Sequence, residues 1–159
     1  MRYGIGYDIH RLAPDRRLVL GGVEIAFGMG LLGHSDADAL VHAIIDALLG
    51  AAAIGDIGQL FPDTDPEYED AESLKLLGVV AEILSKDGFH VANVDSIIVA
   101  EKPKMAPYIM DMRKKISAKL EIPIGCVSVK AKTNEGVDAI GSGEAIAAWA
   151  IACIEREQE

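Results

Sequence analysis

A dense apolar stretch lies between residues 40 and 49, where hydrophobic positions follow one another around every side of a helix. Ser35 is suited to cap this helix by accepting a hydrogen bond from the backbone N–H of Asp38, and Gly50 and Gly55 bracket its end. A helix that faces solvent keeps one polar side, so this pattern predicts a helix that is buried almost all round.

Three polar residues interrupt this apolar surface. Asp38, His42 and Asp46 are four residues apart, so each is rotated by only about 40° from the one before and they form one polar line. Buried polar groups need partners. His42 is therefore either a core histidine satisfied by a neighbouring carbonyl or a ligand of a bound group.

Residues 1–7 alternate as a β-strand, with large side chains on one face and glycines on the other, where a neighbour must approach closely. The strand ends in Asp8 and His10, which point to the same side of an extended chain. With His42 they offer three nitrogen and oxygen ligands. Three protein ligands and one open position are typical of catalytic zinc, whereas a structural site is usually closed by four ligands. The sequence thus predicts one zinc ion per chain.

The remaining pattern predicts a hairpin over 17–27 turning at Gly21 and Gly22, a helix over 70–86, a strand over 94–100, a helix from Pro107 to about Leu120, a strand over 126–132 and a helix from Glu144 to about Arg156. Strands and helices that alternate irregularly indicate an α+β fold. We expect a two-layer sandwich, with a four-stranded mixed sheet, helices packed on one face and a small hairpin. The length fits a single domain over residues 1–159.

Three loops carry most of the remaining polar chemistry. Residues 55–66 are rich in carboxylates, and they form either a solvated loop or a lid that binds a polyhydroxylated ligand. Residues 101–107 contain two lysines; either backbone groups of this loop recognise the edge of a base, or Lys102 and Lys104 are only surface charges. Lys132, Thr133 and Glu135 can give a cation, a hydroxyl and a metal-binding carboxylate to a phosphate chain.

Acidic residues outnumber basic ones by 25 to 15, which gives a net charge of -10. This balance excludes nucleic acid as a partner, and an anionic substrate would need local cations or metal ions for binding. No run reaches the roughly 18 apolar residues of a membrane span, and the start of the chain lacks the apolar core of a signal peptide. We therefore expect no membrane partner and a cytoplasmic location.

Six segments carry a resemblance to a known family: Asp8-Ile9-His10, His34-Ser35-Asp36-Ala37-Asp38, Gly55-Asp56-Ile57-Gly58, Phe61-Pro62-Asp63-Thr64-Asp65, Pro103-Lys104-Met105 and Lys132-Thr133-Asn134-Glu135-Gly136. In this order and spacing the chain resembles the 2-C-methyl-D-erythritol 2,4-cyclodiphosphate synthases of the non-mevalonate isoprenoid pathway. The resemblance covers almost the whole chain.

This resemblance implies a homotrimer with active sites between neighbouring subunits. It also implies a reaction that closes 4-diphosphocytidyl-2-C-methyl-D-erythritol 2-phosphate into a cyclic diphosphate with loss of CMP. Asp8, His10 and His42 would hold zinc, and Glu135 would help to hold a second divalent ion, Mg²⁺ or Mn²⁺. His34 and Thr133 would stabilise the transition state.

The same resemblance implies a larger set of residues that contact the erythritol, the phosphates or the cytidine: Asp8, His10, His34, Ser35, Asp56, Ile57, Gly58, Phe61, Asp63, Asp65, Ala100, Pro103, Lys104, Met105, Ala106, Lys132, Thr133 and Glu135. One region departs from the family pattern. Where the family often has an aromatic residue followed by Gly-Arg-Gly-Glu, this chain has Ala139 and then Ile140-Gly141-Ser142-Gly143-Glu144. An arginine and an aromatic side chain are therefore missing there.

Two other kinds of function use the same residues. A zinc-dependent phosphoric ester or anhydride hydrolase would employ Asp8, His10 and His42 to activate water. A non-catalytic oligomeric ligand-binding protein with a structural metal would need a closed fourth ligand, and the sequence places no further Cys or His for that purpose. Product analysis separates the hydrolase from the cyclising enzyme.

Overall fold

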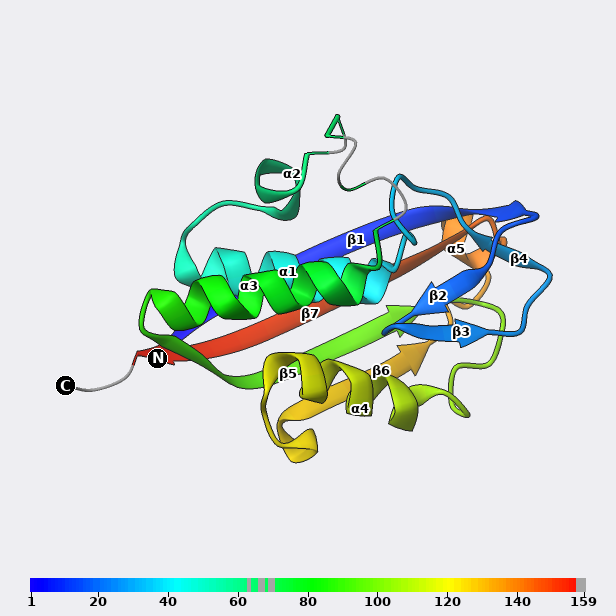
Figure 1. The fold of residues 1–159 in the computed structure, drawn as a ribbon. Coiled ribbons are helices and arrows are strands. Elements are labelled where there is room, and N and C mark those ends of the chain that lie inside the picture. The colour runs from blue at the N-terminus through cyan, green and yellow to red at the C-terminus, as the bar shows by residue number, and fades with distance from the viewer. Residues whose placement is uncertain (63, 66–67, 69–70, 157–159) are drawn as a thin grey trace.

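The chain folds into two layers, a mixed β-sheet and a layer of helices on one of its faces (Figure 1). The structure, a computed structural model, describes residues 1–62, 64, 65, 68 and 71–156. The sheet has the strand order β4-β1-β7-β5-β6, and β2 and β3 form a separate hairpin. β5 and β6 are parallel, whereas the other neighbours in the sheet are antiparallel. The predicted α+β class, mixed sheet and hairpin are confirmed.

The strands are β1 (Arg2–Pro14), β2 (Leu18–Leu20), β3 (Val23–Ile25), β4 (Met29–Leu31), β5 (Phe89–Val99), β6 (Val127–Lys132) and β7 (Ala145–Arg156). The helices are α1 (Ala39–Ala52), α2 (Ile57–Leu60), α3 (Ser73–Lys86), α4 (Ile109–Leu120) and α5 (Asp138–Gly141), with a 3₁₀ turn at Ile124–Cys126. Among the described residues, no helix is both long and apolar enough to cross a membrane.

The prediction of four strands in the sheet is wrong, because β4 adds a fifth at the edge of β1. Leu12 of β1 pairs with Leu31 of β4 in an antiparallel ladder. β4 is only three residues long and contains Gly30, so it is too short to show an alternating pattern. Pairing with a neighbour, and not its own periodicity, makes this segment a strand.

The predicted helix over 144–156 is also wrong, because this segment is β7, the strand between β1 and β5. Three consecutive side chains on its helix side are small, and these residues, Ala148, Ala150 and Ala152, are buried there. Alanine is the strongest helix former, so local propensity favours a helix. Hydrogen bonds to strands on both sides override that propensity.

α1 lies very close to the sheet, as the glycines of β1 predict. A Cβ atom at Gly6 would lie 1.9 Å from the carbonyl oxygen of Ala43, and one at Gly4 would lie 2.0 Å from that of Ala47. Twelve of the fourteen residues of α1 are buried. The predicted buried helix is therefore confirmed, and only glycine on β1 permits this approach.

The N-cap of α1 is Asp38, and the prediction of Ser35 is wrong. One carboxylate oxygen of Asp38 accepts hydrogen bonds from the backbone N–H of Val41 (3.1 Å) and Gly21 (2.9 Å), and the other accepts from Gly22 (2.6 Å). Asp38 is fully buried, and this burial raises the pKa of its carboxyl to about 6. One side chain thus begins α1 and fixes the hairpin turn against it.

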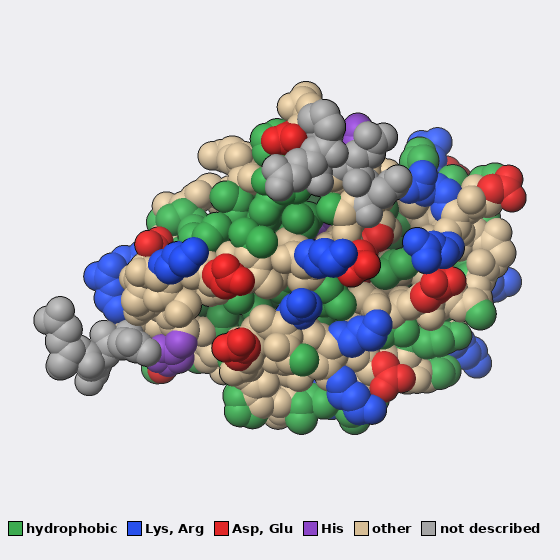
Figure 2. Space-filling view, viewed as in Figure 1, with side chains coloured by type: hydrophobic (Ala, Val, Ile, Leu, Met, Phe, Trp, Pro, Cys, Tyr) green, Lys and Arg blue, Asp and Glu red, His purple; other side chains and the backbone are tan. Residues whose placement is uncertain are grey.

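The two faces of the sheet differ in character. On the helix side, Lys, Arg, Asp and Glu side chains are scattered over the outer surface of α3 and α4 (Figure 2). The opposite face carries large apolar side chains in the open: Tyr3, Ile5, Tyr7 and Ile9 of β1, with Trp149 and Ile151 of β7. We call these six residues the open apolar face. Tyr7 packs on Trp149 with ring centroids 4.7 Å apart, so the face is continuous across the two strands.

Candidate metal and substrate site

Asp8, His10 and His42 meet between β1 and α1, as the sequence predicts. Asp8 Oδ2 lies 2.8 Å from Nδ1 of His42 and 2.9 Å from Nε2 of His10, and these two ring nitrogens are 3.3 Å apart. The three ligand atoms all lie within 4.8 Å of one another. This group, which we call the metal corner, can hold one metal ion through two nitrogens and one oxygen.

The orientation of His10 follows from its second ring nitrogen. Nδ1 lies 2.9 Å from the carbonyl oxygen of Leu32. A carbonyl only accepts hydrogen bonds, so Nδ1 carries the proton and donates it. Nε2 of His10 then faces Asp8, and it becomes a metal ligand once it gives up the proton that it shares with that carboxylate.

The charges of the metal corner favour an ionised carboxylate. Burial by itself would raise the pKa of Asp8, but hydrogen bonds and the charges of His10 and His42 outweigh it and hold that pKa well below its usual range. For His10, burial alone would lower the pKa, whereas the hydrogen bond and negative charge of Asp8 raise it overall. A carboxylate that stays ionised here is suited to bind a cation.

Asp46, the last residue of the polar line on α1, does not contribute to the metal corner but holds α2 in place. Its Oδ1 accepts a hydrogen bond from the backbone N–H of Ile57 (2.8 Å), the first residue of α2. Half-burial is the main reason that its pKa is raised. Asp46 thus anchors α2 beside α1 and is not in the group of three ligands.

The acidic loop after α1 is ordered by its own side chains. Asp56 is the N-cap of α2 and accepts hydrogen bonds from the backbone N–H and the side chain of Gln59 (2.9 and 2.6 Å). Phe61 is buried against Tyr68, with ring centroids 5.3 Å apart. The predicted substrate residues Ile57 and Gly58 lie in α2, and Asp65 follows it. Asp63 lies outside the described residues.

Residues 100–106, which are predicted to bind the cytidine, and the loop that begins at Lys132 lie side by side at the ends of β5 and β6. Val99 pairs with Lys132, and the N–H of Ala100 donates to the carbonyl of Lys132 (2.9 Å). Glu101 Oε1 accepts from the backbone N–H groups of Asn134 (2.8 Å) and Gly136 (3.2 Å). We call residues 100–106 and 132–136 the nucleotide corner.

Within the nucleotide corner, the Thr133 hydroxyl donates to Glu135 Oε1 over 2.8 Å. Lys104, Ala106, Lys132, Thr133 and Glu135 are exposed, whereas Ala100 and Met105 are buried and Pro103 is half-buried. In the departing segment 139–144, the Ser142 hydroxyl lies 2.9 Å from Glu144 Oε1 and donates to it. A serine thus partners Glu144 where the family often has an arginine nearby.

The register of the sheet relates the two corners. Ile9, Ala147, Val99 and Lys132 lie at one level across β1, β7, β5 and β6. Four adjacent strands span about 14 Å. His10 is on the helix face, however, whereas Lys132 shares the open face with Ile9 because side chains at one level point the same way. The side chains of His10 and Lys132 therefore leave the sheet at the same level but on opposite faces, while Ala100 and Met105 of the nucleotide corner pack into the core on the helix side.

The structure of one chain does not bring His34 to Thr133. His34 is exposed in the loop before α1, and none of the hydrogen bonds found among the described residues joins it or the metal corner to Thr133 or Glu135. The metal ligands are thus assembled in one chain, while the two predicted transition-state residues are separate.

Sequence reasoning missed three residues that hold these groups in place. Ser73 and Asp36 lie next to His42, with Ser73 Oγ 2.9 Å from His42 Nε2. Glu101 ties the cytidine loop to the loop of Thr133. Each connects segments that are more than 30 residues apart, so no local pattern could identify them.

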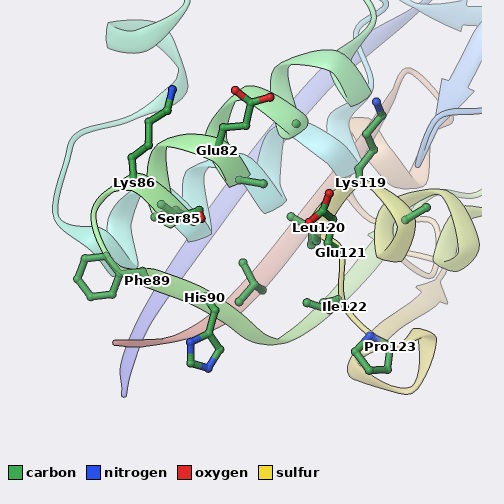
Figure 3. A pocket seen from close by; sticks show the side chains of 15 residues that line it. Glu82, Ser85, Lys86, Phe89, His90, Lys119, Leu120, Glu121, Ile122 and Pro123 are labelled. Carbon is green, nitrogen blue, oxygen red and sulfur yellow. The ribbon is translucent and has the colours of Figure 1, made fainter. Parts of the chain in front are cut away.

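A groove of about 750 Å³ lies elsewhere, between the ends of α3 and α4 and the start of β5 (Figure 3). Phe89 and His90 line it, and Phe89 pairs with Arg156 close to the first residues of β1. Asp8 and His10 lie in the middle of β1, which runs on to Pro14 and does not end at these residues as predicted. This groove is therefore separate from both corners.

Comparison with known proteins identifies the family. Residues 1–155 match the model of the YgbB family. The chain is 54% identical to 2-C-methyl-D-erythritol 2,4-cyclodiphosphate synthase of Clostridium perfringens over 95% of this chain and 97% of that protein.

Solved structures agree with this match. The chain superposes on the bifunctional IspDF of Campylobacter jejuni with a TM-score of 0.95 and 36% identity, covering 99% of this chain and 42% of that one. The IspF of Plasmodium falciparum in its CDP complex matches with a TM-score of 0.87 and 34% identity, over 99% of this chain and 97% of that one. The resemblance inferred from the six motifs is confirmed, and the chain belongs to the YgbB family, the family of the 2-C-methyl-D-erythritol 2,4-cyclodiphosphate synthases.

Proposed function

We propose that this chain converts 4-diphosphocytidyl-2-C-methyl-D-erythritol 2-phosphate into 2-C-methyl-D-erythritol 2,4-cyclodiphosphate and CMP, as a lyase of the non-mevalonate route to isoprenoids. The observation that carries the proposal is the meeting of Asp8, His10 and His42 at one point in a chain that matches the family from end to end. The site can then be assigned residue by residue.

The metal corner holds one zinc ion in this proposal. Its two imidazole nitrogens and one carboxylate oxygen are ligands that zinc favours, and three protein ligands leave a position for a phosphate oxygen. When bound, zinc supplies positive charge against the diphosphate. Asp8 and the two histidines hold their ligand atoms together before any substrate arrives.

The nucleotide corner binds the cytidine and its phosphates. The backbone of residues 100–106 encloses the base, with Pro103, Lys104 and Met105 at its centre. Lys132 provides a cation for the phosphates. Glu135 would hold a second divalent ion, Mg²⁺ or Mn²⁺, whose positive charge would offset that of the phosphates.

The reaction is an intramolecular phosphoryl transfer. An oxygen of the 2-phosphate attacks the β-phosphorus, a new P–O bond forms, and the bond to the oxygen of CMP breaks. Two anionic groups must approach in line, so catalysis consists mainly of charge neutralisation and positioning. His34 and Thr133 stabilise the transition state, and no covalent intermediate with the enzyme is required.

The acidic loop holds the erythritol part of the substrate. Asp56, Gly58 and Asp63 bind its hydroxyl groups, with Ser35, Ile57, Phe61 and Asp65 around them. A preformed α2, capped by Asp56 and anchored through Asp46, supports these contacts. Carboxylates pair well with sugar-like hydroxyls, which favours this role over that of a merely solvated loop.

Three copies of the chain form the working enzyme in this proposal. The open apolar face exposes up to 70% of a side chain, at Ile5, and a continuous apolar surface of this kind favours association. The side chains of His10 and Lys132 leave the sheet on opposite faces, so one copy does not direct both of them at the same substrate. In a closed ring, the metal corner of one subunit faces the nucleotide corner of the next.

The test is to incubate the protein with the cytidine diphosphate substrate, zinc and Mg²⁺ in ¹⁸O-labelled water and to analyse the products by mass spectrometry. Cyclisation yields CMP and the cyclic diphosphate, neither with ¹⁸O, because no water takes part. The alternative, a zinc-dependent phosphoric ester or anhydride hydrolase, would yield open-chain phosphates that carry ¹⁸O. The latter result would overturn the proposal.

A further inference from the structure

Behind His42, on the side away from Asp8, lies a polar group that the roles assigned so far do not use. Ser73, the first residue of α3, is fully buried, and its hydroxyl oxygen is 2.9 Å from Nε2 of His42. The same hydroxyl donates a hydrogen bond to Oδ1 of Asp36. Asp36, Ser73, His42 and Asp8 thus form a continuous polar chain.

The direction of these hydrogen bonds follows from the carboxylate. An ionised carboxylate only accepts, so the hydroxyl proton of Ser73 points to Asp36. The oxygen of Ser73 then presents a lone pair to His42, and Nε2 of His42 must carry a proton and donate it. When a metal ion binds, Nδ1 of His42, which faces Asp8 at 2.8 Å, is then the nitrogen that gives up its proton.

Ser35 is a weaker second partner of the same nitrogen. Its oxygen is 3.2 Å from Nε2 of His42 and already accepts a hydrogen bond from the N–H of Ala37. Among the described residues, its hydroxyl has no carboxylate partner that fixes the direction of its proton. Ser73 therefore decides which nitrogen of His42 is protonated, and Ser35 provides a matched comparison.

Asp36 also fixes the position of Ser73. Its Oδ2 accepts from the backbone N–H of Ser73 (3.0 Å), and its own N–H donates to the carbonyl of Ala71 (3.2 Å). No side chain of α3 itself caps that helix, so this carboxylate serves its first turn from outside. Asp36 thereby docks the start of α3 onto the loop that precedes α1.

We infer that Asp36 and Ser73 are positioning residues that hold His42 in the tautomer a metal ion needs, with Nε2 protonated and Nδ1 free. The inference rests on the metal centre of the proposed function. His10 is fixed in the opposite tautomer by the carbonyl of Leu32, so the two free nitrogens converge on Asp8. Partners of this kind fix ring orientation and raise the basicity of the ligand.

The test measures zinc affinity by chelator competition in four variants and the wild type. Ser73→Ala should weaken zinc binding by about 10- to 100-fold, the usual cost of losing such a partner, and Ser35→Ala by less than about threefold. The loss of zinc affinity in Asp36→Asn should lie between those of Ser73→Ala and Ser35→Ala. The double variant Asp36→Asn/Ser73→Ala should bind zinc as Ser73→Ala does, because Asp36 acts on the metal through Ser73.

Nuclear magnetic resonance of the zinc-loaded protein gives a readout that a merely structural role would not change. The Nε2–H proton of His42 should exchange slowly with water in the wild type and in Ser35→Ala. In Ser73→Ala it should exchange at least about tenfold faster, since its buried acceptor is gone. The Nδ1–H of His10 should be unaffected.

Each outcome decides one question. If the wild type binds no zinc, it is the proposed metal centre that is wrong, and not the role of Asp36 and Ser73. If the wild type binds zinc and Ser73→Ala binds it equally well, the inferred positioning role of Ser73 is wrong. If Ser73→Ala does not fold, Asp36→Asn keeps the packing of Ser73 and decides in its place: unchanged zinc affinity and unchanged proton exchange would overturn the inference.

Discussion

The metal corner and the nucleotide corner of this chain are built in opposite ways. In the metal corner, Asp8, His10 and His42 are 24%, 19% and 11% exposed, and each is held by hydrogen bonds from another segment. In the nucleotide corner, Lys132 is exposed at the end of β6, and Thr133 and Glu135 are exposed in the loop that follows. Glu135 even has a positive φ of 52°, next to Gly136 at 75°.

This difference indicates which part of the site one chain can complete alone. Partly buried ligands with fixed orientations bind a metal without any rearrangement. Exposed groups on a loop gain their geometry only when another surface or a substrate covers them. We therefore regard zinc binding as a property of the single chain and nucleotide binding as a property of the assembly.

The largest effect is expected from His42→Ala, which removes one of three ligands in the metal corner. Zinc content should fall from about one per chain to near zero, and turnover should become undetectable. Circular dichroism and the oligomeric state should stay unchanged, since the open apolar face is not altered. Stoichiometric zinc in this variant, measured by atomic absorption, would show that the ligands are wrongly assigned.

The second prediction separates the two corners by breaking the assembly. Ile5→Asp places a charge in the centre of the open apolar face, where burial in an interface is costly. Light scattering should show monomers, and activity should be lost while zinc content is retained. Val79→Asp, an exposed apolar residue of α3, is the matched control and should remain assembled and active. A monomeric Ile5→Asp variant with full activity would refute the shared site.

A third change acts on the nucleotide corner alone. Glu135→Gln should reduce kcat by at least about 100-fold, because a lost divalent ion removes several kcal/mol of charge stabilisation. Its zinc content should equal that of the wild type, and excess Mg²⁺ or Mn²⁺ should restore part of the activity. Glu82→Gln, on the exposed side of α3, serves as control. Loss of zinc in Glu135→Gln would mean that the two metal sites have been confused.

The smallest effect concerns Asp38, which supports the helix of the metal corner. Its pKa is about 6 in the folded chain against an ordinary value of 3.8, so folding favours the protonated carboxyl. The stability that this group contributes is complete below about pH 4 and is lost as pH rises to about 6, a change of about 2 to 3 kcal/mol.

Urea unfolding from pH 4 to pH 7 checks this sign when the wild type is compared with Asp38→Asn. The asparagine does not titrate, so its free energy of unfolding should rise relative to the wild type across this window. Groups that do not interact with Asp38 titrate equally in both proteins and cancel in the difference. Parallel profiles for the two proteins would show that Asp38 keeps an ordinary pKa.

Local patterns predicted the metal corner well for a physical reason. Asp8 and His10 share a face because strand side chains alternate, and His42 faces them because a helix buried all round must have its polar line against the sheet. The glycines of β1 likewise predicted the close approach of α1. Each of these inferences depends on geometry within one element.

The errors and omissions share a cause as well. The alanines of β7 favour a helix, and only pairing with β1 and β5 makes them a strand. Ser35 resembles a cap, but Asp38 takes that place because it also holds the hairpin turn. Ser73 and Glu101 act across more than 30 residues. Contacts between distant segments decided all of these, and a single sequence does not display them.

The central claim, that each site combines the metal corner of one subunit with the nucleotide corner of its neighbour, is tested most directly by mixing two inactive variants. His42→Ala lacks the metal corner, and Lys104→Glu damages the nucleotide corner. After co-refolding in equal amounts, about one quarter of the interfaces in random trimers carry both intact halves, so we predict about one quarter of wild-type activity. No recovery, with subunit mixing verified by native mass spectrometry, would contradict the account, because each site would then be built from one chain.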